Sequence, residues 1–205
     1  MNIVPKPHIL FISYYFPPMG GGGVQRSLKF LKYWNYQKYQ VSILTVKPSY
    51  SYAEDPSLED EIPRTLSVHR SATVDPFRFL FLFKKFIPHS IRSKGGGINE
   101  GGQSLRRFSN FFLLPDSRIP WLPLALRRLG RIHRSRPVDL IVATMPPFTA
   151  GMIALYANRL WKIPFLLDFR DAWTQNLYLP TVSSLHQSIQ EKLEYRTLQG
   201  AAGYI

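Results

Sequence analysis

The sequence predicts an α/β protein built on a Rossmann-like, doubly wound parallel sheet, and two observations support this prediction. Short β-branched or aromatic runs of strand length alternate with longer segments in which apolar residues recur at helical spacing. A run of four glycines joins the first strand to the first helix, as in the βαβ units that build parallel sheets. We expect the chain, residues 1–205, to form one such domain.

The glycine loop lies in the most informative stretch of the sequence. An aromatic strand over residues 9–15 precedes it, an amphipathic helix follows it, and it consists of Gly20, Gly21, Gly22 and Gly23. The N–H groups of these glycines, at the positive end of the helix dipole, suit a phosphate or another anion. A tight turn that lets the helix pack close to the strand explains the glycines equally well.

The remaining elements continue the alternation. Further strands are predicted over residues 41–46, 66–70, 138–144 and 164–169, and further helices over residues 122–132, 149–161 and 184–199. The last helix is expected to open with a capping box, Ser184 to Gln187. Residues 94–104 are rich in glycine and are expected to form a mobile loop within the domain. Since residues 201–205 only begin a strand, we expect the chain to be a fragment.

Composition excludes several classes of protein. The chain has no cysteine, so it has neither disulfides nor thiol chemistry. No apolar stretch approaches the roughly 18–20 residues that a membrane-spanning helix needs. Lys6 leads directly into the first strand, which is not the layout of a secretory signal.

The net charge of +13 is concentrated in the middle of the chain. Residues 78–136 hold thirteen Lys or Arg residues but only two acids, Glu100 and Asp116. Such a basic face indicates an anionic partner. Charge alone does not distinguish a membrane surface, a polyphosphate and a nucleic acid. A solvated surface with no partner is the alternative.

A segment crowded with phenylalanine, residues 77–87, lies within this basic region. Aromatic side chains flanked by cations are typical of a membrane-surface segment, and a helix packed on the sheet fits the same pattern. The helix that begins near residue 122 places several arginines on its polar face. The residues predicted for a membrane surface are Phe79, Phe81, Lys84, Lys85, Arg127, Arg128 and Arg131.

Two nucleotide-binding motifs fail in detail. Gln25 stands where the third glycine of a dinucleotide loop belongs, and Lys47 follows the second strand where an acid would bind ribose. No Gly-Lys-Ser/Thr follows the glycines, so the loop is not a Walker loop. His and Cys show no metal-ligand spacing, and no Ser–His–acid order stands out.

Polar residues at the carboxyl ends of the predicted strands are the candidates for chemistry. Asp171, beside Arg170, is the best acid or base, although it could instead cap the next turn or pair with Arg170. Thr144 offers a hydroxyl at its strand end. Asp116 and Trp121 lie in a proline-punctuated turn that could face a sugar or a lipid phosphate, and Trp121 could equally be a core aromatic.

Taken in order, these motifs resemble the N-terminal domain of family 4 glycosyltransferases, which are retaining enzymes of the GT-B fold. The matching features are Phe16-Pro17-Pro18 with the glycine loop, Asp116 with Trp121, Thr144 with Pro146-Pro147, and the run from Asp168 to Trp173. The resemblance covers nearly the whole chain. One departure is Arg170, because many relatives have a His beside the Asp that follows this strand.

The resemblance implies the first, acceptor-side half of a two-domain enzyme. It implies sugar transfer from a nucleotide-sugar donor to an acceptor hydroxyl, with the leaving diphosphate near Gly20 to Gly23. Asp171 and Arg170 would be catalytic, and Asp116, Trp121 and Thr144 would bind the acceptor. A C-terminal donor-binding domain is absent from this sequence, so the isolated domain is expected to be inactive.

The partners implied are a nucleotide sugar, a hydroxyl acceptor that is lipid-linked in many relatives, and an anionic membrane surface. This matches a peripheral protein of polysaccharide biosynthesis on the cytoplasmic face of the membrane. Neither an obligatory metal or other cofactor nor a nucleic acid is expected. The alternative is a non-catalytic, basic Rossmann-like module that binds a membrane surface or another polyanion.

Overall fold

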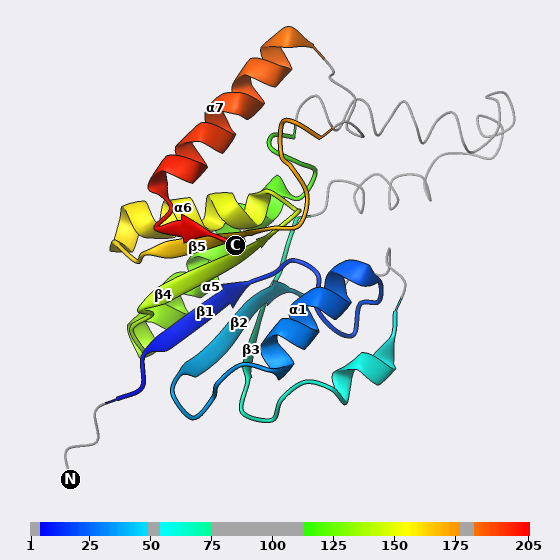
Figure 1. The fold of residues 1–205 in the computed structure, drawn as a ribbon, viewed down its shortest axis with the longest axis vertical. Helices are drawn as coiled ribbons and strands as arrows, with labels where there is room; N and C mark the ends of the chain where they lie inside the picture. The colour runs from blue at the N-terminus through cyan, green and yellow to red at the C-terminus, as the bar shows by residue number, and fades with distance from the viewer. Residues whose placement is uncertain (1–4, 49–53, 75–112, 177–182) are drawn as a thin grey trace, which may run out of the picture.

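The computed structural model describes residues 5–48, 54–74, 113–176 and 183–205 of the chain (Figure 1). Within these residues the strands are β1 (His8–Ile12), β2 (Gln40–Val46), β3 (Ser67–Ser71), β4 (Leu140–Met145), β5 (Phe165–Phe169) and β6 (Gly203–Tyr204). The α-helices are α1 (Gly22–Lys32), α5 (Leu122–Ser135), α6 (Thr149–Trp161) and α7 (Ser184–Gly200). Two short 3-10 helices, η1 (Pro56–Glu59) and η2 (Ile119–Trp121), complete the described elements.

The strands form one sheet in the order β3-β2-β1-β4-β5-β6, and every neighbouring pair is parallel. This order places β1 and β4 together at the centre, where the direction of winding reverses, as in a doubly wound sheet. Helix α1 covers one face of the sheet, and α5 and α6 cover the other (Figure 1). The predicted Rossmann-like fold is confirmed. The glycine-rich stretch 94–104 lies outside the described residues.

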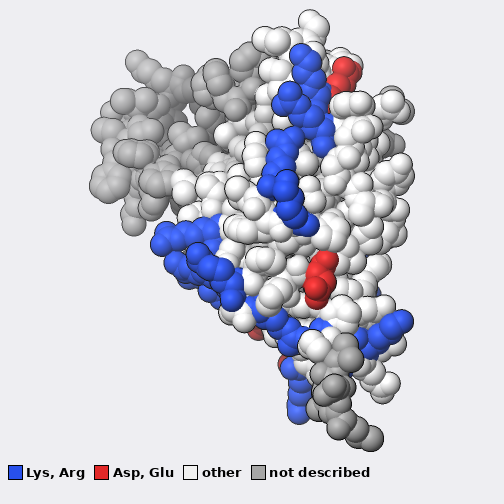
Figure 2. All heavy atoms as spheres, turned by 90° about the vertical axis from the view of Figure 1, so that its left-hand side faces the viewer, with Lys and Arg blue, Asp and Glu red and all other residues white. Residues whose placement is uncertain are grey.

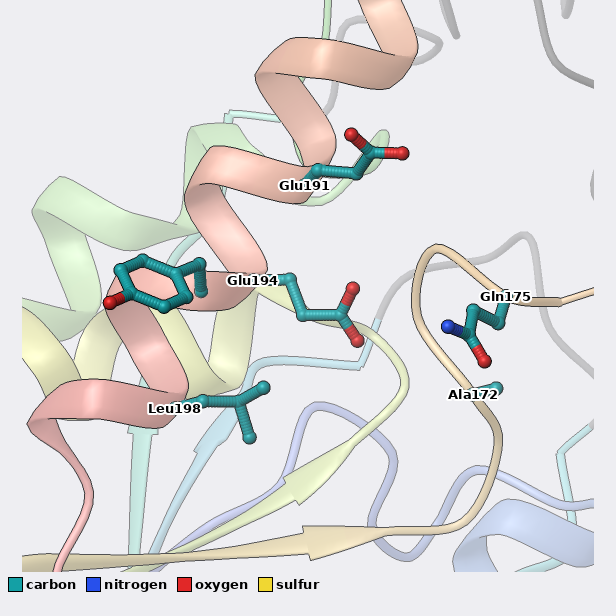
Figure 3. A pocket seen from close by; sticks show the side chains of 6 residues that line it. Ala172, Gln175, Glu191, Glu194 and Leu198 are labelled. Carbon is teal, nitrogen blue, oxygen red and sulfur yellow. The ribbon is translucent and has the colours of Figure 1, made fainter.

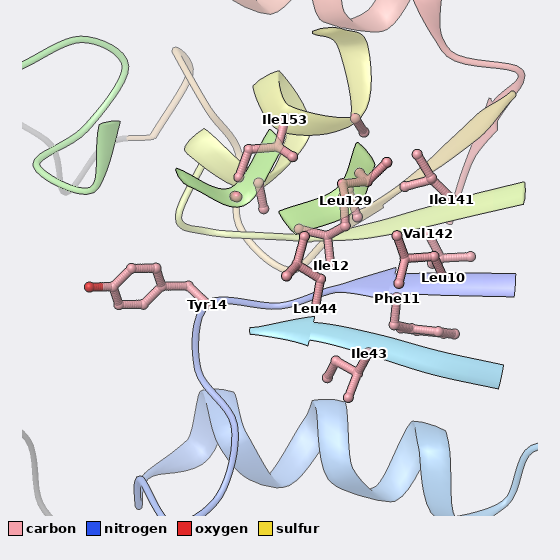
Figure 4. Close-up of a cluster of buried hydrophobic side chains, with 14 of the residues drawn as sticks. Leu10, Phe11, Ile12, Tyr14, Ile43, Leu44, Leu129, Ile141, Val142 and Ile153 are labelled. Carbon is pink, nitrogen blue, oxygen red and sulfur yellow. The ribbon is translucent and has the colours of Figure 1, made fainter. Parts of the chain in front are cut away.

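The core consists of apolar side chains on both faces of the central strands (Figure 4). All five residues of β1 are buried, which is typical of a parallel strand covered by helices on both sides. On the α1 side, the Phe11 ring packs against Phe30 and Trp34 at centroid distances of 5.4 and 5.1 Å. On the opposite side, Leu44 points toward Leu129 of α5 (Figure 4).

The start of α7 differs from its prediction. Ser183, not Ser184, is the N-cap residue, and its hydroxyl accepts a hydrogen bond from the backbone N–H of His186 at 3.1 Å. The predicted capping box from Ser184 to Gln187 is therefore wrong by one residue. The Gln187 amide instead donates to the Glu191 carboxylate one turn later, at 2.9 Å.

Helix α6 approaches the sheet closely because its inner face is built from small residues. A Cβ on Gly151 would lie 2.5 Å from Met145 Sδ and 3.3 Å from Thr197 Cγ2. A side chain at this position would have to displace the Met145 side chain of β4 and press on Thr197 of α7. The small residues of this helix therefore allow it to pack closely on the sheet.

We therefore predict that Gly151→Val lowers the free energy of unfolding by about 1–3 kcal/mol, since overpacking displaces well-packed neighbours. Urea denaturation followed by circular dichroism measures this change. Gln199→Val, which puts the same side chain at an exposed position of α7, is the matched control and should cost only a few tenths of a kcal/mol. Equal losses for the two variants would contradict the packing argument.

His8 is a buried titratable group at the amino end of β1. Its Nδ1 lies 3.2 Å from the Pro137 carbonyl oxygen, so this nitrogen carries the proton. Nε2 then accepts from the Ser42 hydroxyl at 2.7 Å. Burial, and secondarily the charge of Arg136, lower the pKa of His8 below its ordinary value of 6.5.

This lowered pKa predicts that acid destabilises the fold. In the unfolded chain His8 gains its proton near its ordinary pKa of 6.5, whereas in the folded chain it does so only at lower pH. The contribution of neutral His8 to the free energy of unfolding is therefore fully present above pH 6.5 and is lost as the pH falls below it. Denaturation midpoints measured between pH 8 and pH 5 should show the decline. The decline should be shallower in His8→Gln, and an unchanged pH dependence in that variant would show that His8 is not responsible.

Candidate functional site

The loops that follow β1, β4 and β5 meet at the carboxyl edge of the sheet, where ligands of doubly wound sheets bind. The register of β4 and β5 pairs Met145 with Phe169, so both strands end at the same level. The Arg170 N–H then donates to the Met145 carbonyl at 2.9 Å. This edge holds the glycine loop, Thr144 and the run from Asp168 to Trp173.

The glycine loop leads into an open helix end. Gly21 is the N-cap residue of α1, with a φ of 103° that favours glycine, and no side chain caps the helix. A Cβ on Gly21 or Gly22 would meet nothing within 4 Å, and the first turn contains no acid. The positive end of α1 is therefore open at the carboxyl edge of the sheet, as an anion-binding site requires.

The Arg170 side chain is fixed beside this helix end. Its Nε donates to the Met145 carbonyl at 3.3 Å, and its Nη2 donates to the Pro146 carbonyl. A Cβ on Gly23 would lie 2.5 Å from Arg170 Nη1, so a side chain at position 23 would have to displace the guanidinium. The guanidinium thus lies beside Gly23, at the start of α1.

The positive charge of Arg170 is not neutralised by an ion pair with a described residue. Among the described residues no carboxylate forms an ion pair with it. Burial lowers the pKa of Arg170, and the nearby charges of Asp171 and Asp168 oppose that shift. A half-buried cation that lacks an ion-pair partner, next to an open helix end, favours binding of an anion.

A second arginine at this edge is neutralised. Arg26 Nη2 lies 2.5 Å from Asp168 Oδ1 in an ion pair, and the Thr144 hydroxyl donates to Asp168 Oδ2 at 2.8 Å. Hydrogen bonding to Asp168 raises the pKa of Arg26. Asp168 therefore links α1, β4 and β5, and the Thr144 hydroxyl is already engaged.

Asp171 is held between two anchored neighbours. Arg170 precedes it, and Trp173 follows two residues later, buried and stacked on Phe148 with a centroid distance of 4.7 Å. The Trp173 indole N–H donates to Gln190 of α7 at 2.8 Å. The Asp171 side chain itself is exposed and forms no hydrogen bond with another described residue. The loop thus presents a free carboxylate on a fixed backbone.

Asp116 stabilises the amino end of α6. Its carboxylate accepts from the Thr149 N–H at 2.9 Å and the Thr149 hydroxyl at 2.8 Å, and from the Arg118 N–H at 2.8 Å. Burial raises the pKa of Asp116, and these hydrogen bonds oppose the rise. Both carboxylate oxygens are therefore engaged within the protein.

Trp121 is fully buried, donates its indole N–H to Ser71 at 2.7 Å and packs edge-on against Tyr14. The structure favours the core interpretation of this residue. Thr144 is also buried. The three residues predicted to bind the acceptor, Asp116, Trp121 and Thr144, therefore do not form one exposed surface.

The outer surfaces of α5 and α6 carry a group of exposed cations that we call the α5–α6 face, namely Arg127, Arg131, Arg134, Arg159 and Lys162. Neither helix contains an acidic residue, and none of these cations forms an ion pair with a described residue. Figure 2 shows Lys and Arg side chains on this side of the molecule with few acids among them.

The other residues predicted for a membrane surface differ in their positions. Arg128 is only partly exposed, and its Nε is buried without a partner among the described residues. Phe79, Phe81, Lys84 and Lys85 lie outside the described residues.

No described helix has the length and apolar character needed to cross a membrane. Within the described ranges, no cluster of three or more His, Cys, Asp or Glu side chains could hold a metal.

Sequence reasoning missed two features of this edge. The Arg26–Asp168 pair joins positions 142 residues apart, and no local pattern of the sequence indicates it. A carboxylate within a buried strand signals that some cation must lie nearby, but not which one. The contacts of α7, from Gln190 to Trp173 and from Glu194 to Thr174, were also missed.

Solved structures with a related arrangement include UGT2 of Phytolacca americana, without ligand and complexed with UDP-2fluoro-glucose and pterostilbene. They are 18% and 16% identical to this chain, with TM-scores of 0.44 and 0.43, and cover 80% and 82% of it. A UDP-glucosyltransferase from Polygonum tinctorium, in complex with 3,4-dichloroaniline, is 17% identical over 82% of this chain, with a TM-score of 0.42. This chain spans 29–31% of these proteins.

No curated protein sequence matches the chain. A family model described as the glycosyl transferase 4-like domain matches residues 21–205, which include the open end of α1, Arg170 and Asp171. The match extends over most of the sequence, and the protein therefore belongs to the glycosyl transferase 4-like domain family.

Proposed function

We propose that the chain is the acceptor-side, N-terminal domain of a two-domain, retaining glycosyltransferase that uses a nucleotide-sugar donor. The observation that carries this proposal is the Arg170 guanidinium, held by the Met145 and Pro146 carbonyls against Gly23 at the open end of α1. A diphosphate that leaves the donor sugar develops negative charge, which a fixed cation and a helix end can stabilise.

The chemistry assigned to each group follows from its position. Arg170 and the first N–H groups of α1 would bind the leaving diphosphate, in a mechanism that needs no obligatory metal. The exposed Asp171 carboxylate would orient the acceptor hydroxyl or accept its proton. Donor binding would require a second domain, so this domain alone is expected to be inactive in transfer.

The α5–α6 face supports a second part of the proposal, docking on an anionic membrane surface. Four of its five cations lie on adjacent helices without acids, and the fifth, Lys162, directly follows α6. Leu160 and Tyr156 beside them are 61% and 36% exposed. Cations near an anionic leaflet each contribute about 1 kcal/mol, and exposed apolar side chains add to this attraction. A peripheral position on the inner face of the membrane suits a lipid-linked acceptor in polysaccharide biosynthesis.

Pyrophosphate is a direct probe of the diphosphate site. We predict that the chain binds it at low salt and that Arg170→Gln weakens binding about tenfold, because a hydrogen bond to a charged group contributes about 1.5–3 kcal/mol. Titration followed by ³¹P NMR measures the dissociation constants.

Arg64→Gln is the matched control, since it removes one exposed cation from a position outside the site. This variant should bind pyrophosphate like the unaltered chain. Failure of the unaltered chain to bind, or an equal loss in both variants, would overturn the diphosphate site.

Vesicle co-sedimentation tests membrane docking. We predict that the chain binds vesicles with anionic lipid but not neutral ones, and that binding fades at high salt. The triple variant Arg127→Gln, Arg131→Gln, Arg134→Gln should bind about a hundredfold more weakly, given about 1 kcal/mol for each cation.

A second triple variant, Lys38→Gln, Lys47→Gln, Arg64→Gln, makes the same charge change away from the α5–α6 face. It should retain most of the binding. If both triple variants lose the same affinity, net charge alone drives the attraction and no docking face exists.

A further inference from the structure

A pocket of about 330 Å³ lies between α7 and the loop that follows β5 (Figure 3). Its volume is at the small end of the roughly 300–1,000 Å³ that ligand sites span. The residues that line it are Ala172, Gln175, Glu191, Glu194, Tyr195 and Leu198. Ala172 directly follows Asp171 in the chain, so the loop that lines the pocket is the same loop that carries the carboxylate assigned to the acceptor hydroxyl.

The two glutamates of the pocket are each half engaged. Glu194 Oε2 accepts hydrogen bonds from the N–H and the hydroxyl of Thr174, and Glu191 Oε1 accepts from the Gln187 amide at 2.9 Å. These bonds orient the carboxylates and leave Glu194 Oε1 and Glu191 Oε2 without a donor among the described residues. Each remaining oxygen can accept a hydroxyl in a charge-assisted hydrogen bond.

The rest of the lining combines polar and apolar surface. In Figure 3, Glu194 points from α7 toward the loop that carries Ala172 and Gln175, and Glu191 lies about one turn away on the same helix. The Gln175 amide both donates and accepts hydrogen bonds, and Leu198 and Ala172 add apolar surface. Hydroxyl groups alternate with C–H faces on a sugar ring, so this lining matches a sugar better than it matches a purely apolar ligand.

The charge of the pocket lining narrows the class of ligand further. Its described residues include two carboxylates and no Lys or Arg, so a phosphate or a uronic acid would be repelled. The open end of α1 with Arg170, by contrast, is positively charged. The carboxyl edge of the sheet therefore offers one place for a diphosphate and another, across Asp171, for an uncharged group rich in hydroxyls.

We propose that this pocket is an acceptor subsite that binds an uncharged sugar unit, with Glu191 and Glu194 accepting its hydroxyls. The inference rests on the proposed glycosyltransferase function and specifies the class of its acceptor. The acceptor hydroxyl would reach Asp171 while the rest of the sugar unit occupies the pocket.

Saturation-transfer NMR with methyl α-D-glucopyranoside, methyl α-D-galactopyranoside and methyl α-D-mannopyranoside tests the subsite. At least one glycoside should receive saturation from the chain, and D-glucuronate should receive none. Glu191→Gln should weaken binding of that glycoside about tenfold, because the hydroxyl loses a charged acceptor. Asp60→Asn, which removes an exposed carboxylate elsewhere, should leave binding unchanged.

The absence of saturation for all three glycosides, or the same effect in Glu191→Gln and Asp60→Asn, would overturn the subsite. Pyrophosphate titration of the same samples separates this failure from failure of the proposed function. Pyrophosphate binding without glycoside binding would remove the subsite alone. Glycoside binding that depends on Glu191, without pyrophosphate binding, would keep a sugar pocket and remove the diphosphate site.

Discussion

The parallel pairing of β4 with β5 is the constraint on which the candidate site depends. Because both strands end at the same level, the carbonyls that follow β4 lie within reach of the side chain that follows β5. Arg170 uses them as fixed acceptors, and its guanidinium then lies against Gly23. An antiparallel partner would end at the opposite edge and could not supply these carbonyls. The position of this cation at the open end of α1 thus follows from the topology of the sheet.

The site separates opposite charges over a short length of chain. Arg170 is the cation at the open end of α1, while Asp171 is an exposed carboxylate one residue later and Glu191 and Glu194 lie beyond it. Arg26 does not add to the positive side, because Asp168 neutralises it. Trp173 and Gln190 fix the loop between these regions. The proposed glycosyl transfer would use this separation, with an anionic leaving group on one side and a neutral nucleophile on the other.

The sequence was sufficient for the fold, but not for the side-chain contacts at the carboxyl edge of the sheet. Helix α6 was predicted with its observed ends because apolar residues recur at helical spacing over residues 149–161. The turn around Asp116 and Trp121 could not be resolved, since proline punctuation does not say which side chains face inward. The ion pair of Arg26 with Asp168 depends on tertiary packing that no local pattern encodes.

The contact between Gly23 and Arg170 has an evolutionary consequence. Two positions distant in the sequence share one small volume, because a Cβ at position 23 would displace the guanidinium from its observed place. A side chain at position 23 becomes tolerable only when residue 170 is shortened or leaves the Met145 and Pro146 carbonyls. The two positions should therefore covary among related domains, with glycine retained wherever the arginine is present and relaxed where a smaller residue replaces it.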